Sequence, residues 1–111
     1  MDWKAELATA NAALAAYRKA TPEGAAGFSA MHKAAMGPGA VGLKEKELIC
    51  LAIGIVRQCT DCIGFHVKAA IAAGASREEI AETITVTVYM GGGPAYMYGV
   101  KALEAYDQLA G

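Results

Sequence analysis

Proline and glycine divide this chain into stretches of helix length, and this division constrains the fold more than any other sequence feature. The strongest breaks fall at residues 21–22, 37–39 and 91–94. Between them, apolar residues recur near helical spacing, as Trp3, Leu7 and Leu14 do in the first stretch. Alanine, the best helix former, is the commonest residue, with 25 copies. We therefore expect an all-α fold.

About six helices are predicted, with boundaries that follow local start and stop signals. Asp2 and Thr21 are candidate N-caps, and Ser76 with Glu79 has the spacing of a capping box. Residues 83–90 alternate β-branched side chains, which favours a strand, but they continue a strong helix start and no partner strand is evident. The expected helices cover residues 2–20, 22–36, 43–57, 59–74, 77–90 and 95–109.

The size and composition of the chain favour one domain that associates with copies of itself. Its 111 residues fit a single domain, residues 1–111. Hydrophobic residues make up 55% and charged residues 19%, so more apolar surface exists than a small core can bury. With 10 basic and 11 acidic residues and no basic patch, a nucleic-acid partner is not expected. The longest apolar run, residues 48–56, is too short for a membrane span, and no signal peptide is evident, so we expect a cytoplasmic protein.

The stretch from Cys59 to His66 is where the sequence points to chemistry. At the start of a helix, Cys59, Cys62 and His66 project from one face, because they are spaced by three and four residues. The helix N-terminus favours a thiolate, and the histidine one turn on can accept a thiol proton. A histidine in this role needs an orienting partner, and Glu47, at the start of an apolar helix, is the best candidate.

The spacing of these residues resembles the active-site signature of the AhpD-like alkylhydroperoxidases, within the wider carboxymuconolactone decarboxylase family. In this chain, eleven residues separate Glu47 from Cys59-Thr-Asp-Cys62, and three more precede His66. The resemblance covers about residues 43–109. It implies an AhpD-like helical domain and a homo-oligomer, commonly a trimer or hexamer. It also implies peroxidase or thiol-disulfide oxidoreductase activity, with Cys59 and Cys62 as the redox pair, His66 as relay and Glu47 as base. The substrate would be a hydroperoxide or a disulfide and the reductant an external dithiol. No cofactor is expected and no metal ligand is assigned.

Asp61 departs from the AhpD-like signature, and the decarboxylase activity in the family name does not carry over to this chain. Some members carry a histidine between the two cysteines, where this chain has Asp61. An acid there disfavours a thiolate unless its side chain is turned away. True decarboxylases of the wider family lack the cysteine pair, so decarboxylase activity is not expected here.

Other interpretations of the same residues stay open. Cys59, Cys62 and His66, with Glu47, could bind zinc in a regulatory module without turnover. The cysteines could also be incidental in a dehydratase-like or isomerase-like relative. A thioredoxin is disfavoured because no strand leads into the motif.

Three further residues are assigned ordinary roles. Cys50 lies in an apolar run without polar neighbours, so we expect a core residue with a raised pKa and an unreactive thiol. Asp61 is expected to be an exposed acid in the first turn of its helix. His32 is expected at the surface or at a subunit interface.

Overall fold

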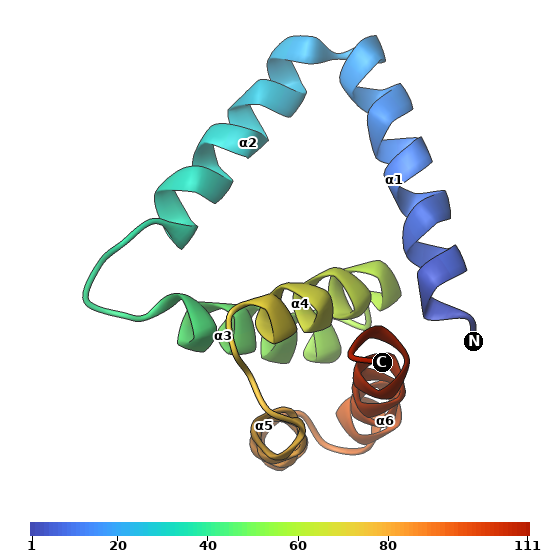
Figure 1. The fold of residues 1–111 in the computed structure, drawn as a ribbon, viewed down its shortest axis with the longest axis vertical. Coiled ribbons are helices and arrows are strands. Elements are labelled where there is room, and N and C mark those ends of the chain that lie inside the picture. Colours follow the sequence, from blue (N-terminus) through green and yellow to red (C-terminus); the bar gives the residue numbers. More distant parts are fainter.

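The computed structural model describes all 111 residues as six α-helices without a β-strand (Figure 1). This confirms the all-α prediction, including the helical assignment of the β-branched segment 83–90. None of the six helices combines the length and apolar character that crossing a bilayer requires. The helices are α1 Trp3–Ala20, α2 Pro22–Met36, α3 Leu43–Val56, α4 Thr60–Ala72, α5 Arg77–Gly91 and α6 Gly93–Leu109.

The helix starts follow the predicted signals, with one exception. Asp2 caps α1 by accepting from the Ala5 N–H, and Ser76 and Glu79 form both hydrogen bonds of the capping box at α5. We had predicted that Thr21 caps α2. Thr21 does occupy the N-cap position, but its side chain makes no capping hydrogen bond, and its hydroxyl instead donates to the Tyr17 carbonyl of the preceding helix. Pro22 still occupies the first turn of α2, where its missing N–H costs nothing.

The β-branched segment of α5 stays helical because its polar side chains are satisfied within the helix. Thr83, Thr85 and Thr87 each donate a hydroxyl hydrogen bond to the carbonyl four residues earlier. The alternation of threonine with isoleucine and valine therefore reflects these internal bonds and apolar packing rather than a strand.

Helices α3 to α6 form the body of the protein, with α3 and α4 lying side by side and α5 and α6 crossing them (Figure 1). Its core combines a few large side chains with many alanines, which let the helices approach closely. The buried members are Leu51, Ile55, Ile63, Val67, Ala70, Ala75, Ile80, Ala95, Ala102 and Ala105, joined by Trp3 of α1.

The start of α1 is fastened to this body through Trp3, which is fully buried. Its indole N–H donates to Glu104 at 2.7 Å and its backbone N–H to Gln108 at 2.8 Å, both on α6. The ring lies against Gly64 of α4, where an added Cβ would come within 3.0 Å of it. The far end of α1 extends away from the body, and α2 returns from it at a distance from the other helices (Figure 1). No residue of α2 is buried.

A tight turn joins α3 to α4, and it requires an unusual backbone conformation at Gln58. The Cys59 N–H bonds the Gly54 carbonyl and the Gln58 N–H bonds the Ile55 carbonyl, which is the Schellman pattern. This pattern places Gln58 in the left-handed region, with a φ of 55°. Glycine normally occupies this position, as Gly74 does after α4 with a φ of 96°. The turn fixes where Cys59 begins the next helix.

Replacement of Gln58 should change stability according to how well the new residue tolerates a positive φ. We expect Gln58→Val to be less stable than Gln58→Gly by about 1–2 kcal/mol, because a β-branched side chain is strained there. Urea unfolding at one protein concentration measures the difference. Equal midpoints for the two variants would show that the turn does not impose this strain.

Candidate active site

Helices α3 and α4 face each other most closely at Gly54 and Cys62. A Cβ added to Gly54 would lie 3.2 Å from the Cys62 Cβ, so a larger residue would force the helices apart. Glu47, Cys50, Gly54 and Arg57 recur every three or four residues along one face of α3. Cys62 and His66 of α4 lie against this face of α3. The sequence spacing therefore determines which side chains of the two helices meet.

Cys59 and Cys62 form a disulfide at the N-terminus of α4, with their Cα atoms 5.2 Å apart. Cys59 is the N-cap of this helix, and the Cys62 backbone N–H donates to its sulfur at 3.2 Å. When the pair is reduced, the same N–H and the positive end of the helix favour a thiolate at Cys59. The predicted placement of the pair at a helix start is confirmed.

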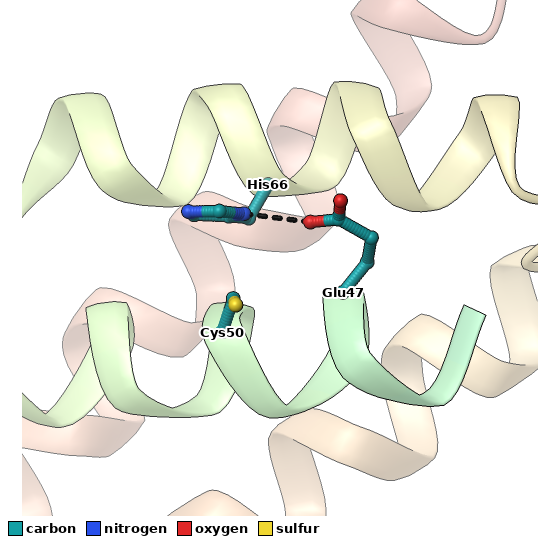
Figure 2. A group of neighbouring side chains, drawn as sticks. All are labelled: Glu47, Cys50 and His66. Carbon is teal, nitrogen blue, oxygen red and sulfur yellow. Dashed lines mark hydrogen bonds and ion pairs between the residues drawn. The ribbon is translucent and has the colours of Figure 1, made fainter. Parts of the chain in front are cut away.

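Glu47 and His66 form a hydrogen bond between α3 and α4 (Figure 2). The His66 Nδ1 lies 2.7 Å from the Glu47 Oε1, and Glu47 is only 6% exposed. When Glu47 is ionised its carboxylate can only accept, so in that state the Nδ1 carries the hydrogen and donates it. Nε2, on the far side of the ring in Figure 2, is then left as a proton acceptor. The predicted partnership of these two residues is therefore present, while their catalytic roles stay predictions.

The disulfide and the Glu47–His66 pair lie at one open cavity of about 490 Å³. Both cysteines of the disulfide and His66 line it, and Glu47 lies behind the histidine. Arg57, which the sequence analysis missed, supplies a cation to the wall. Its spacing from Glu47 and Gly54 along α3 is the signal that could have identified it. The lining residues are Cys50, Ile53, Gly54, Arg57, Cys59, Cys62 and His66.

Cys50 corrects one expectation and confirms another. It is not a core residue without polar neighbours, because its thiol lines the cavity and lies in one group with Glu47 and His66 (Figure 2). Ligand atoms of these three residues all lie within 4.8 Å of one another. Burial raises the pKa of the Cys50 thiol, and the negative charge of Glu47 raises it further. The raised pKa agrees with the expectation of a weakly reactive thiol.

Asp61 is in the first turn of α4, but it is not the exposed acid that we had expected. Its Oδ1 is buried without a hydrogen-bond donor, and the side chain lies against Glu6 of α1. Hydrogen bonding with Asp61, and then its negative charge, raise the pKa of Glu6. When Glu6 is protonated, its carboxyl group can supply the donor that the Asp61 Oδ1 lacks. Asp61 does not line the cavity, so this departure from the AhpD-like pattern is turned away from the opening to the thiols.

The fold and the site define an all-helical protein with a Cys-x-x-Cys pair beside a half-buried histidine that is hydrogen-bonded to a buried glutamate. The profile of the carboxymuconolactone decarboxylase family matches residues 22–105. The chain belongs to this family.

Solved structures of relatives have the same fold over nearly the whole chain. The apo form of lpg0406, a carboxymuconolactone decarboxylase family protein from Legionella pneumophila, has a TM-score of 0.95 and 41% identity, covering 98% of this chain and 97% of that one. TM1620 from Thermotoga maritima has a TM-score of 0.83 and 27% identity over 95% of this chain and 90% of its own. It belongs to the same family, and a part in the antioxidative response has been suggested for it.

A curated relative is similar in sequence without a known activity. The uncharacterised protein H16_B0147 of Cupriavidus necator is 37% identical over 108 residues, which covers 97% of this chain and 96% of its own. The comparisons therefore establish family and fold.

The raised pKa of Cys50 predicts the pH dependence of its alkylation. In the disulfide form Cys50 is the single free thiol, so the rate of reaction with iodoacetamide reports its thiolate fraction. The rate should rise at a higher pH than it does for the same thiol in urea, because folding disfavours the charged form. Glu47→Gln should move the profile back toward that of the unfolded chain. An identical profile for the folded and unfolded protein would contradict the raised pKa.

Proposed function

We propose that this protein is a cysteine-dependent peroxidase or thiol-disulfide oxidoreductase, in which Cys59 and Cys62 cycle between dithiol and disulfide. The observation that carries the proposal is the Glu47–His66 hydrogen bond of 2.7 Å beside a cavity that both cysteines line. A hydrogen-bonded acid and histidine next to an accessible dithiol is the arrangement needed to move a proton to and from sulfur. The antioxidative role suggested for the Thermotoga maritima relative agrees with it.

In the proposed reaction, His66 accepts the Cys62 proton through Nε2 while Glu47 holds the opposite ring nitrogen. The Cys62 thiolate attacks the terminal oxygen of a hydroperoxide, and the O–O bond breaks. The alcohol product leaves after taking the proton from the imidazolium. Cys62 becomes a sulfenic acid, so the peroxide is reduced and the sulfur oxidised by two electrons.

The second half of the cycle uses Cys59. Its thiolate attacks the Cys62 sulfur, the S–O bond breaks, and the leaving hydroxide takes a proton and departs as water. An external dithiol then attacks the Cys59–Cys62 disulfide, is itself oxidised to a disulfide, and regenerates both thiols. A disulfide substrate would enter by the same exchange chemistry without the peroxide step.

The surroundings suit Cys62 as the attacking sulfur and Cys59 as its partner. Cys62 is one helical turn from His66, and Cys59 is the N-cap whose sulfur accepts the Cys62 N–H. A thiol held at the positive helix end is a good leaving group in exchange. Arg57 in the cavity wall favours negative charge that develops on sulfur or on the departing oxygen.

A thiol count during turnover tests the redox cycle. When the reduced protein meets a small excess of an organic hydroperoxide, two of its three thiols should disappear as one intramolecular disulfide while peroxide is consumed. Cys50 should remain free, because its thiol is largely protonated. Unchanged thiols together with unchanged peroxide would reject the peroxidase reaction.

Variants of the proton relay test the roles of Glu47 and His66. His66→Ala should lower kcat/KM for the hydroperoxide by about 100-fold or more, since the general base is gone. Glu47→Gln should lower it less and alter the pH profile, because the imidazole keeps its place but loses its carboxylate. Glu45→Gln, an exposed acid two residues earlier on α3, is the matched control and should behave as the unaltered protein. Equal activities for Glu45→Gln and Glu47→Gln would remove Glu47 from the mechanism.

We also propose that the chain assembles into a homo-oligomer, a trimer or a hexamer. Helix α2 buries none of its residues, and Phe28 and Met31 on it are 78% and 67% exposed. Further apolar side chains are exposed on α3, α5 and α6, including Ile53, Tyr89 and Met97. A second copy of the chain offers matching apolar surface, and its approach would remove these side chains from water.

A charge on α2 should weaken the assembly. We expect Phe28→Asp to raise the dissociation constant by about tenfold or more, because a carboxylate would replace an aromatic side chain that the proposed interface covers. Glu23→Gln, at an exposed position of the same helix, should leave it unchanged. Analytical ultracentrifugation over a concentration series measures both. A monomer at all concentrations in the unaltered protein would reject the oligomer.

A further inference from the structure

Glu47, Cys50 and His66 together form a group of side chains that the redox proposal does not fully use. Glu47 and Cys50 are three residues apart on one face of α3, and His66 reaches them from α4 (Figure 2). Ligand atoms of the three lie within 4.8 Å of one another. They offer one carboxylate oxygen, one sulfur and one imidazole nitrogen.

We propose that Glu47, Cys50 and His66 bind a thiophilic divalent cation of the zinc type, with one coordination position open to the cavity. Zinc takes sulfur at about 2.3 Å, imidazole nitrogen at about 2.0–2.1 Å and carboxylate oxygen at about 2.0–2.2 Å. Tetrahedral coordination at these lengths separates ligand atoms by about 3.3–3.7 Å. From the present separations of up to 4.8 Å, side-chain rotations that move the ligand atoms by about 1 Å would reach that arrangement.

The donor set selects the class of metal. Magnesium and calcium prefer shells made only of oxygen, whereas a thiol with an imidazole suits zinc and its spectroscopic substitute cobalt. On binding, the Cys50 S–H bond breaks and its proton passes to water. The hydrogen bond between Glu47 and His66 opens, and the imidazole hydrogen moves from Nδ1 to Nε2, so that Nδ1 can coordinate the cation. No oxidation or reduction takes place.

The cavity explains how such a cation would enter and what would complete its coordination. Cys50 and His66 line the opening, while Glu47 closes the inner side and is buried. Three protein ligands plus one accessible position is the pattern of an open zinc site, where water takes the fourth place. Cys59 and Cys62 line the same cavity, but in the disulfide they have no thiolate to give.

This site differs from the zinc site suggested by the sequence, which used Cys59 and Cys62 with His66. The structure places Cys50 beside the Glu47–His66 pair, so a metal can bind here while the disulfide stays closed. One consequence rests on the proposed function: a bound cation occupies His66 and Glu47 and therefore inhibits turnover. Metal binding itself requires no turnover, so the two proposals fail independently.

Cobalt titration of the disulfide form, freed of metal with a chelator, tests the site. We expect one Co²⁺ per chain, a thiolate-to-cobalt charge-transfer absorption in the near ultraviolet, and displacement by Zn²⁺ but not by Mg²⁺. Cys50→Ser, nearly isosteric, should abolish that absorption and weaken binding by about tenfold or more. Far-ultraviolet circular dichroism verifies that this variant is folded.

Two control variants test whether the cation instead uses the Cys59–Cys62 pair or His32 as ligands. The Cys59→Ser, Cys62→Ser double variant should keep the charge-transfer absorption, and so should His32→Asn on the exposed helix α2. Loss of the absorption in the double variant would move the sulfur ligand to the cysteine pair and overturn the proposal. Absence of the absorption in the unaltered protein, or its survival in Cys50→Ser, would overturn it as well.

Discussion

The close antiparallel packing of α3 on α4 is the constraint on which the rest of the site depends. Gly54 lets α4 approach until an added Cβ would lie 3.2 Å from the Cβ of Cys62. In an antiparallel pair, one turn back along α3 lies opposite one turn forward along α4, which brings Cys50 to the level of His66. One more step back along α3 reaches Glu47, whose carboxylate meets the imidazole at 2.7 Å. A single contact at glycine thus sets the register of all four polar side chains.

The turn between α3 and α4 fixes the position of the two cysteines relative to these helices. The Cys59 N–H is held by the Gly54 carbonyl at the end of α3, and the Cys59 sulfur accepts the Cys62 N–H at the start of α4. Cys59 therefore closes the turn that ends α3, caps the start of α4 and supplies one sulfur of the disulfide. Because both backbone and sulfur are held, the pair does not depend on a mobile loop for its placement.

The sequence predicts the helices and most of the site because both follow from local spacing. Glycine and proline breaks give the helix boundaries to within a few residues, and three- and four-residue spacing places Cys59, Cys62 and His66 on one face. What the sequence does not give depends on contacts between helices. Cys50 seemed to lack polar neighbours because the residues beside it on the chain are apolar, whereas its polar neighbours come from the preceding turn of α3 and from α4.

Two further residues escaped prediction for related physical reasons. Asp61 was expected to be exposed, but the start of α1 is fastened to the body through Trp3, which brings Glu6 against Asp61. Gln58 occupies a left-handed position that sequence rules assign to glycine, so the turn left no compositional signal. Long-range docking and a strained turn are the features that local patterns do not encode.

Three thiols share one cavity, and the structure separates their chemistry by electrostatics rather than by distance. Cys59 lies at the positive end of α4 and accepts a backbone N–H, so negative charge on it is stabilised. Cys50 lies beside the Glu47 carboxylate, and burial with that charge raises its pKa. A protonated thiol is a poor nucleophile in exchange, so the raised pKa disfavours attack by Cys50 on the Cys59–Cys62 disulfide. In the proposed metal site, a divalent cation would change this at Cys50 alone. Its charge replaces the proton and pairs with the carboxylate that, together with burial, raises the pKa of the thiol.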